Sequence, residues 1–409
     1  MVNKNLNTQY LLILLGGILL FYPFIAIFVI AYLMIYNKVL NNYFIFLYTL
    51  VVFSLTFYLR LYGHITSING SSDDAITYLH AFNILQMHGF MDFFKYAAMQ
   101  GITTVEPFYW GLYDFIGYLT NYNKYIFVFL NYCLPIAMFL FSLRLFFKEK
   151  YLLAFLLIST FGYQYYYALI FSTWRQSLAF SYIILSFYFM SKNKTKQSFL
   201  LLLLATFTHL SSIIYLFIYL LYILKNSKLN MTMIVMITVF MGIVLYVMLD
   251  YYNDILTNKL DVYTSGKHVL NQVRSAFLVK FSGAVIISWI ILKKSYELKD
   301  VQLQVFSFFL LIGNILVLAT MHFGTITTRL QLSINLLFLI TISYYISKYY
   351  DYGKRIYIFV LLIVFIIFLR LSVDDKFFSM FLLDGDFQSG IIYSIYDFWK
   401  LFNIKRGFE

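Results

Sequence analysis

The sequence has little charge, little proline and almost no cysteine. Of its 409 residues, 12% are charged, 3 are proline and 1, Cys133, is cysteine. A single cysteine excludes an internal disulfide framework, because no second thiol is present to pair with it. No proline-rich linker, low-complexity tract or internal repeat divides the chain. We therefore expect one domain over residues 1–409.

Long apolar runs take up most of the chain. Hydrophobic residues make up 62% of it, and many runs approach the ~20 residues needed to cross hydrocarbon as a helix. The pattern predicts an all-α polytopic membrane protein with roughly eleven or twelve transmembrane helices. The first run is too long for the core of a cleavable signal peptide and lacks a cleavage pattern. The runs lie near 10–36, 43–59, 125–147, 151–170, 173–190, 198–224, 231–249, 276–292, 302–321, 327–347 and 355–371.

Lysine marks one set of the connecting loops. By the positive-inside rule, "FFKEK", "SKNKTK", "LKNSK", "LKKSYELK" and "SKYYDYGKR" belong to the cytoplasmic side. With residues 37–42, Arg144 and Asp300 included, the cytoplasmic loops hold 15 basic and 4 acidic residues, against 7 and 7 in the periplasmic segments. The net charge of +12 therefore needs no nucleic-acid partner. The predicted periplasmic segments are 60–106, 171–175, 250–275 and 322–329.

One apolar run has both ends on the lysine side. Residues 199–224, "FLLLLLATFTHLSSIIYLFIYLLYIL", lie between two lysine-rich loops and are too short for two full crossings. We expect two short or broken helices that meet near "THLSS", which puts His209 at the break; such backbone is tolerated at membrane depth only where it lines a protein cavity. The alternative is one long tilted helix with His209 facing a neighbour.

Another short segment has the character of an interfacial helix. Residues 106–120, "EPFYWGLYDFIGYLT", are too few and too polar to cross the membrane. Pro107 is suited to the first position of a helix, where its missing N–H costs nothing. We expect a re-entrant or interfacial helix that begins there.

Arginine is rare, and it has an uneven distribution. Only 8 of the 30 basic residues are Arg, and 13 of the 15 in the cytoplasmic loops are Lys. The planar guanidinium grips phosphate with two parallel hydrogen bonds, which Lys cannot do. A polyanion site at the periplasmic face is one interpretation, and charged anchors at helix ends are the other. For Arg175, beside Gln176, the alternative to an anion site is a simple water-facing turn. The periplasmic arginines are Arg60, Arg175, Arg274 and Arg329.

Acidic side chains gather in the first long periplasmic segment. Asp73 and Asp74 follow the turn signal "NGSS" and precede "AITYLHAFNIL", which has helical spacing. If Ser72 or Asp73 is the helix N-cap, Asp74 lies in the first turn, one turn before Tyr78. Glu106 enters a mostly apolar stretch, where partial burial would make its carboxylate a better proton acceptor.

The histidines do not form a metal-binding pattern. None of their spacings matches those of known ligand sets. We therefore expect neither a metal ion nor a cofactor. The histidines considered are His64, His80, His88 and His322.

A series of short motifs resembles a known family. "LRLYG", "DDAITYLHAF", "EPFYWGL", "STWRQSLAFSYIILS" and "LATFTHLSS" follow one another over about 60–215, and "GTITTRLQLSINLL" comes later. Their order resembles the EpsG-like branch of Wzy-type polysaccharide polymerases, which include bacterial O-antigen polymerases. One departure is "DD", where similar sequences often have Gly followed by a single Asp.

The resemblance implies a reaction and its substrates. A growing chain would move from its undecaprenyl pyrophosphate onto the terminal sugar of an incoming lipid-linked unit, at the periplasmic face of the inner membrane. The fold would be that of C-type membrane glycosyltransferases, and a chain-length regulator is an expected partner. The four periplasmic arginines, with Gln176 and Tyr78, would bind pyrophosphate and substrate. As the base that accepts the acceptor's proton we rank Asp74 first, His209 second and Glu106 third.

The same features are compatible with other functions. A flippase for lipid-linked oligosaccharides would share the size, charge and location, but transporters often show internal repeats and polar groups near the bilayer midplane. A glycosyltransferase that uses a polyprenyl monophosphate sugar would need fewer Arg. An O-antigen ligase would be expected to have a large late periplasmic domain, which we do not find.

Overall fold

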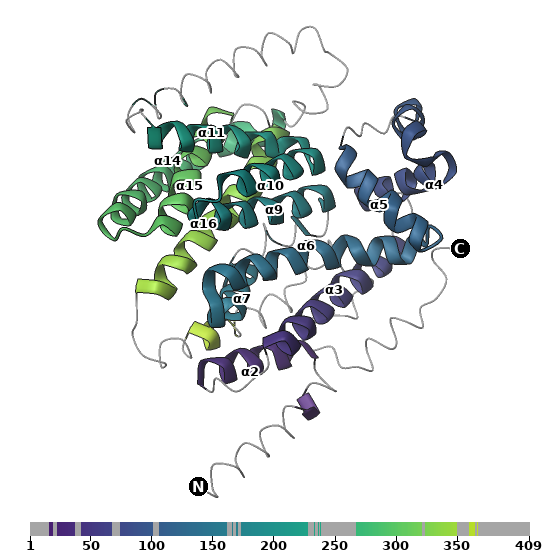
Figure 1. Ribbon diagram of the computed structural model, residues 1–409, viewed down its shortest axis with the longest axis horizontal. Helices are drawn as coiled ribbons and strands as arrows, with labels where there is room; N and C mark the ends of the chain where they lie inside the picture. The colour runs from purple at the N-terminus through teal and green to yellow at the C-terminus, as the bar shows by residue number, and fades with distance from the viewer. Residues whose placement is uncertain are drawn as a thin grey trace, which may run out of the picture.

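The described part of the chain is helical throughout. The computed structural model describes residues 16–18, 23–36, 42–67, 74–100, 106–161, 173–227, 267–320, 324–349 and 360–364, with positions 166, 169, 170, 233, 236, 238 and 366. Every regular element within these ranges is an α-helix or a short 3₁₀ helix (Figure 1). The predicted all-α class is confirmed.

Three described helical stretches are long and apolar enough to cross a membrane. They are Lys124–Phe161, Val301–Ala319 and Arg329–Tyr349. The first contains α6 (Lys124–Phe147), η1 (Lys148–Lys150) and α7 (Tyr151–Phe161). Lys148 has a φ of 52°, which ends α6 and turns the chain into α7. The predicted membrane class is confirmed, while the number of crossings stays a prediction.

The helices pack as a bundle around α9. This helix packs against α6 and α10, α3 packs against the far side of α6, and α15 packs between α14 and α16 (Figure 1). Aromatic rings join further pairs of helices: the rings of Phe187 in α9 and Phe309 in α15 have centroids 4.3 Å apart, and those of Phe53 in α3 and Phe155 in α7 are 4.8 Å apart. The helices are α2 (Pro23–Tyr36), α3 (Asn42–Ser67), α9 (Trp174–Ser191), α10 (Thr195–Thr208), α14 (Lys267–Glu297), α15 (Val301–Ala319) and α16 (Gly324–Tyr349).

The predicted break near "THLSS" is present. Helix α10 ends at Thr208, His209 is extended (φ −154°, ψ 117°), and η2 (Leu210–Ser212) leads into α11 (Ile213–Ser227). Tyr219 of α11 donates a hydrogen bond to the carbonyl of Thr195, the first residue of α10 (2.9 Å). The chain therefore turns back along α10, and the alternative of one long tilted helix is wrong.

Two further helices, one from the predicted periplasmic segment 60–106 and one from the predicted interfacial segment 106–120, lie at one side of the bundle (Figure 1). They are α4 (Asp74–Met99) and α5 (Pro107–Leu119). As predicted, α5 begins at Pro107; its 13 residues give a length of about 20 Å, too short to cross the membrane. Gly89 has a φ of 69° and bends α4. Gly117 lets Tyr122 pack against α5, because a Cβ there would lie 2.6 Å from the ring.

The lysine-rich loops meet at one end of the bundle. The ring centroid of Phe146, just before η1, lies 5.7 Å from that of Tyr188 near the end of α9. It lies 6.5 Å from that of Tyr344 near the end of α16. Lys150 donates a hydrogen bond to the carbonyl of Ser347 (3.0 Å). Loops that the positive-inside rule assigned to one side are therefore neighbours in space.

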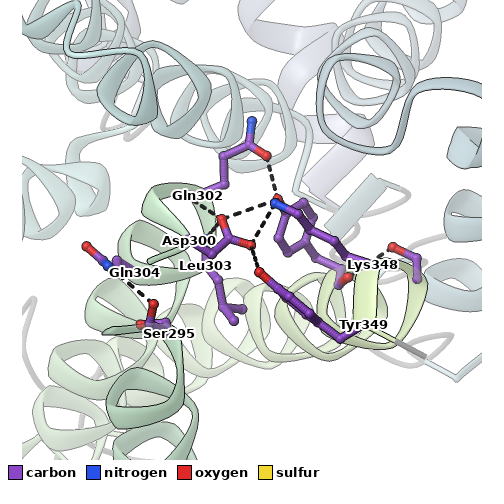
Figure 2. A network of polar contacts seen from close by, with 9 residues as sticks. Ser295, Asp300, Gln302, Leu303, Gln304, Lys348 and Tyr349 are labelled. Atoms are coloured by element: carbon purple, nitrogen blue, oxygen red, sulfur yellow. Dashed lines mark hydrogen bonds and ion pairs between the residues drawn. The ribbon is translucent and has the colours of Figure 1, made fainter. Parts of the chain in front are cut away.

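A network of polar contacts closes this end between α15 and α16 (Figure 2). Asp300 caps α15 by accepting hydrogen bonds from the backbone N–H groups of Gln302 and Leu303 (3.1 and 3.2 Å). Its other oxygen accepts from Lys348 Nζ (2.8 Å) and from the Tyr349 hydroxyl (2.6 Å). One carboxylate thus ties the start of α15 to the end of α16.

Helices extend further into the predicted periplasmic segments than hydropathy indicates. Helix α3 continues past Arg60 to Ser67, α4 occupies much of 60–106, and α14 begins at Lys267 and not at 276. Apolar composition marks where hydrocarbon ends, whereas helical hydrogen bonds continue within the polar region beyond it. The rest of the predicted segment 250–275 lies outside the described residues.

Candidate functional site

The first turn of α9 carries Arg175. The helix begins at Trp174, whose buried indole stacks on Tyr78 of α4 (centroids 5.2 Å apart). A cation in the first turn faces the positive end of the helix dipole, so Arg175 lies where it does not stabilise the helix. The same helix end attracts anions through its unpaired N–H groups. The position suits an anion-binding role better than a helix-stabilising one.

The guanidinium of Arg175 has two protein partners among the described residues. Its Nη1 donates to Glu106 Oε2 at 2.5 Å, and its Nε donates to the Tyr78 hydroxyl at 3.1 Å. The guanidinium carbon also lies 5.0 Å from the centre of the Tyr78 ring, a cation–π distance. The Arg175 side chain is 15% exposed, and Nη2 has no acceptor within the described part of the chain.

Glu106 precedes α5 at the N-cap position but does not cap it. No side-chain hydrogen bond joins it to the first turn, although an acidic side chain is favoured there. Instead its carboxylate lies against Arg175, and the side chain is 7% exposed. The backbone still starts the helix, because the Glu106 carbonyl accepts from Trp110 N (3.3 Å). Glu106 therefore forms an ion pair with Arg175 of α9 instead of capping α5.

The break after α10 brings His209 to the same carboxylate. Its Nδ1 lies 3.5 Å from Glu106 Oε1, which is a contact and longer than a normal hydrogen bond. The imidazole is 7% exposed, and neither ring nitrogen has a hydrogen-bond partner among the described residues. The charges of Glu106, Arg175 and Arg329 all act on it. A buried imidazole without a partner is costly, so the ring is suited to meet a ligand.

Gln176 ties α9 to α16. Its Nε2 donates to the backbone carbonyl of Arg329 at 2.7 Å, while its Oε1 is buried without a partner among the described residues. This bond fixes the backbone of half-buried Arg329 beside the start of α9. The predicted binding of a phosphate or sugar oxygen by Gln176 stays a prediction.

Six predicted site residues therefore meet, from five elements of the bundle. We call them the Arg175 cluster: Tyr78, Glu106, Arg175, Gln176, His209 and Arg329. Among the described residues, no group of three or more His, Cys, Asp or Glu side chains could hold a metal ion.

For the other predicted site residues, the structure does not describe the side chains. Asp74 is the first residue of α4, Arg60 lies in α3 and Arg274 in α14. Their side chains, and the whole of Asp73, lie outside the described residues. Their membership of the site stays a prediction.

Sequence reasoning missed the aromatic packing beneath the cluster. Tyr109 donates to Asn131 Oδ1 at 2.6 Å, which ties α5 to α6. Trp174 packs edge-to-face on Phe127 and Tyr132. The dipeptide "WR" at the start of an apolar run was the available signal, since an aromatic beside a cation at a helix start can serve as its anchor. These contacts fix the position from which Arg175 extends.

A family model covers most of the chain. The EpsG family model matches residues 51–381, well over half of the 409 residues. The chain belongs to the EpsG family. The matched range contains the whole Arg175 cluster, and membership indicates a polymerase-like role in polysaccharide biosynthesis. No curated protein and no solved structure matches the chain. The resemblance drawn from the motifs is therefore confirmed at the level of the EpsG family.

Proposed function

We propose that this EpsG-family protein is a polysaccharide polymerase, of the O-antigen polymerase type, that joins repeat units linked to undecaprenyl pyrophosphate. The observation that carries the proposal is the ion pair of Arg175 and Glu106 beside His209, whose ring nitrogens have no hydrogen-bond partner among the described residues. It combines an anion-binding group, a carboxylate and a proton acceptor in one buried place. In transfer of a sugar from a lipid pyrophosphate, these groups would stabilise the leaving anion, orient the base and accept the proton of the acceptor.

Arg175 and Arg329 would act on the leaving group. As the new glycosidic bond forms, the bond between the anomeric carbon and the phosphate oxygen breaks, and its electron pair leaves with the lipid pyrophosphate. Guanidinium groups already in position stabilise this developing charge without reorganisation. Gln176, the neighbour of Arg175, binds the backbone carbonyl of Arg329, which supports a shared binding space at the start of α9. The N-terminus of α9 adds its own attraction for the anion.

His209 would accept the proton of the acceptor hydroxyl. Its Nδ1 faces Glu106 Oε1, so the carboxylate can orient the ring and stabilise the imidazolium that forms. Nε2 has no partner among the described residues and is available for the hydroxyl. The contact favours His209 over the first-ranked Asp74, which remains the alternative base from the start of α4.

The arrangement of charge supports a site at the periplasmic leaflet. The lysine-rich loops gather at the end of the bundle near Ser191, whereas Arg175 begins the same helix about 24 Å away. With lysine on the cytoplasmic side, the Arg175 cluster faces the opposite side of the inner membrane. The substrate would arrive there by lateral diffusion in the lipid, and a chain-length regulator would be a partner.

The polysaccharide of a deletion strain tests the proposal. Loss of the polymer ladder, with a single capped unit retained on a gel of surface polysaccharide, is the expected result. Loss of every unit would contradict it and indicate the alternative, a flippase for lipid-linked oligosaccharide. Purified protein should then extend undecaprenyl-pyrophosphate-linked units in vitro, without an added nucleotide sugar or cofactor. Activity only with a polyprenyl monophosphate sugar would point to the second alternative.

A further inference from the structure

The carboxylate of Glu106 lies between the guanidinium of Arg175 and the imidazole of His209. Its Oε2 is bound to Arg175 Nη1 at 2.5 Å, while its Oε1 lies 3.5 Å from His209 Nδ1. The first contact is a short charge-assisted hydrogen bond, and the second is too long to be one. In this structure Glu106 Oε2 is therefore bound to Arg175, and Oε1 has His209 within reach.

We propose that Glu106 is an internal substitute for the donor's phosphate: its carboxylate binds Arg175 until the pyrophosphate of the donor displaces it. The displaced carboxylate is then free to act with His209. This rests on the proposed function and names how donor binding is coupled to proton removal from the acceptor. Donor binding would precede activation of the acceptor. Without a bound donor, the carboxylate is neutralised by Arg175 and supports the imidazole only weakly.

The geometry of Arg175 allows such an exchange. Its Nη2 keeps two N–H donors without an acceptor among the described residues, and the side chain is partly exposed. An incoming anion can therefore reach Nη2 first and then take over Nη1. Pyrophosphate carries more charge than one carboxylate and matches the planar fork, so it competes well. Tyr78 holds Nε at 3.1 Å and keeps the guanidinium in place throughout.

The exchange also resolves an electrostatic conflict. Proton transfer to His209 creates an imidazolium beside the charges of Arg175 and Arg329. Two neighbouring cations oppose a third. Bound pyrophosphate neutralises the arginines, and the released Glu106 becomes the partner of the new imidazolium. Base strength at His209 thus depends on an occupied donor site, which links proton removal to the presence of a donor.

The test measures binding of inorganic pyrophosphate to purified protein by calorimetry. Glu106→Gln removes the internal competitor and is expected to bind pyrophosphate about tenfold more tightly than wild type, which corresponds to about 1.4 kcal/mol. The same variant should lose chain extension. Asp114→Asn is the matched control: it is an acid on the same helix, paired with Tyr122 (2.8 Å) and away from Arg175. Its affinity should equal that of wild type.

The outcomes separate this inference from the proposed function. Unchanged or weaker pyrophosphate binding in Glu106→Gln, with normal binding in wild type, would overturn the exchange and leave the polymerase proposal intact. A wild-type protein that does not bind pyrophosphate would contradict the donor site itself.

A second measurement needs no variant that could misfold. Infrared difference spectra of wild type should show a carboxylate band that shifts when pyrophosphate is added, because the carboxylate loses its guanidinium partner. The Asp114→Asn variant should show the same shift of this band when pyrophosphate is added. A spectrum without any carboxylate change would also overturn the exchange.

Discussion

Glu106 and Arg175 are 69 residues apart in the sequence and meet at 2.5 Å between the starts of α5 and α9. Both side chains are mostly buried, at 7% and 15% exposure. Buried pairs of this kind cost desolvation energy, so they are weak evidence for stability. Their position beside His209 gives the pair a chemical rather than a structural interpretation, and the expected effects of substitutions follow from that.

Arg175→Lys is expected to lower chain extension by at least roughly tenfold, because one lost charge-assisted hydrogen bond costs ~1.5–3 kcal/mol. Lysine keeps the charge but cannot bind Tyr78, Glu106 and a phosphate together. The measurement is extension of lipid-linked units at matched membrane expression. Arg144→Lys is the control, since Arg144 packs over the ring of Tyr43, 4.7 Å away, and lies outside the Arg175 cluster. Full activity of Arg175→Lys would favour a simple anchor at the helix end.

Three variants separate the candidate bases. His209→Ala is expected to bind the lipid-linked donor yet fail to extend it, and Glu106→Gln is expected to behave in the same way. Asp74→Asn should keep most activity if His209 is the base. Donor binding and ladder length are measured separately on each variant. Wild-type ladders in His209→Ala, with loss in Asp74→Asn, would return the role to Asp74.

Asp300 should make stability depend on pH at the lysine-rich end. Burial raises the pKa of its carboxyl, but hydrogen bonds from Lys348, Tyr349 and the Leu303 backbone outweigh burial, so the pKa is lowered overall. A lowered folded-state pKa gives stability that is present above the unfolded value of about 3.9 and is lost as pH falls through the folded value.

Asp300→Asn keeps an N-cap oxygen but removes the charge. At neutral pH it should lower the free energy of unfolding by about 1.5–3 kcal/mol, with the difference shrinking below about pH 4. Thermal unfolding in detergent, at neutral pH and below about pH 4, measures the loss of stability and its dependence on pH. Glu297→Gln is the control: its pair with Lys294 is exposed, so no measurable change is expected. An equal loss for Asp300→Asn at all pH values would contradict the charge argument.

Thiol labelling tests the sidedness of the two ends. In a background with Cys133→Ala, Asp92→Cys on α4 should react with a membrane-impermeant reagent in cells whose outer membrane is permeabilised. Lys194→Cys, in the loop between α9 and α10, should react only after the inner membrane is broken. Both positions are exposed. Labelling of Lys194→Cys in unbroken cells would reverse the orientation and contradict a periplasmic site.

The sequence was sufficient for the features that depend on local composition. Apolar runs predicted the helical membrane class, and lysine-rich loops predicted which ends lie together. The lysine on both sides of 199–224 predicted the break at His209, and Pro107 predicted the start of α5. Each of these follows from the preference of nearby residues for lipid, water or a helix terminus, which needs no knowledge of distant partners.

Tertiary structure decided which polar groups meet. The sequence grouped Arg175 with other arginines, whereas packing gave it Glu106 and Tyr78 as partners. The sequence did not indicate that the amide of Gln176 binds the carbonyl of Arg329 across 153 positions of the chain. No spacing encodes such contacts, since each polar side chain has several acceptable partners. The angle and depth at which helices cross select one of them, and these are set by side chains throughout the bundle.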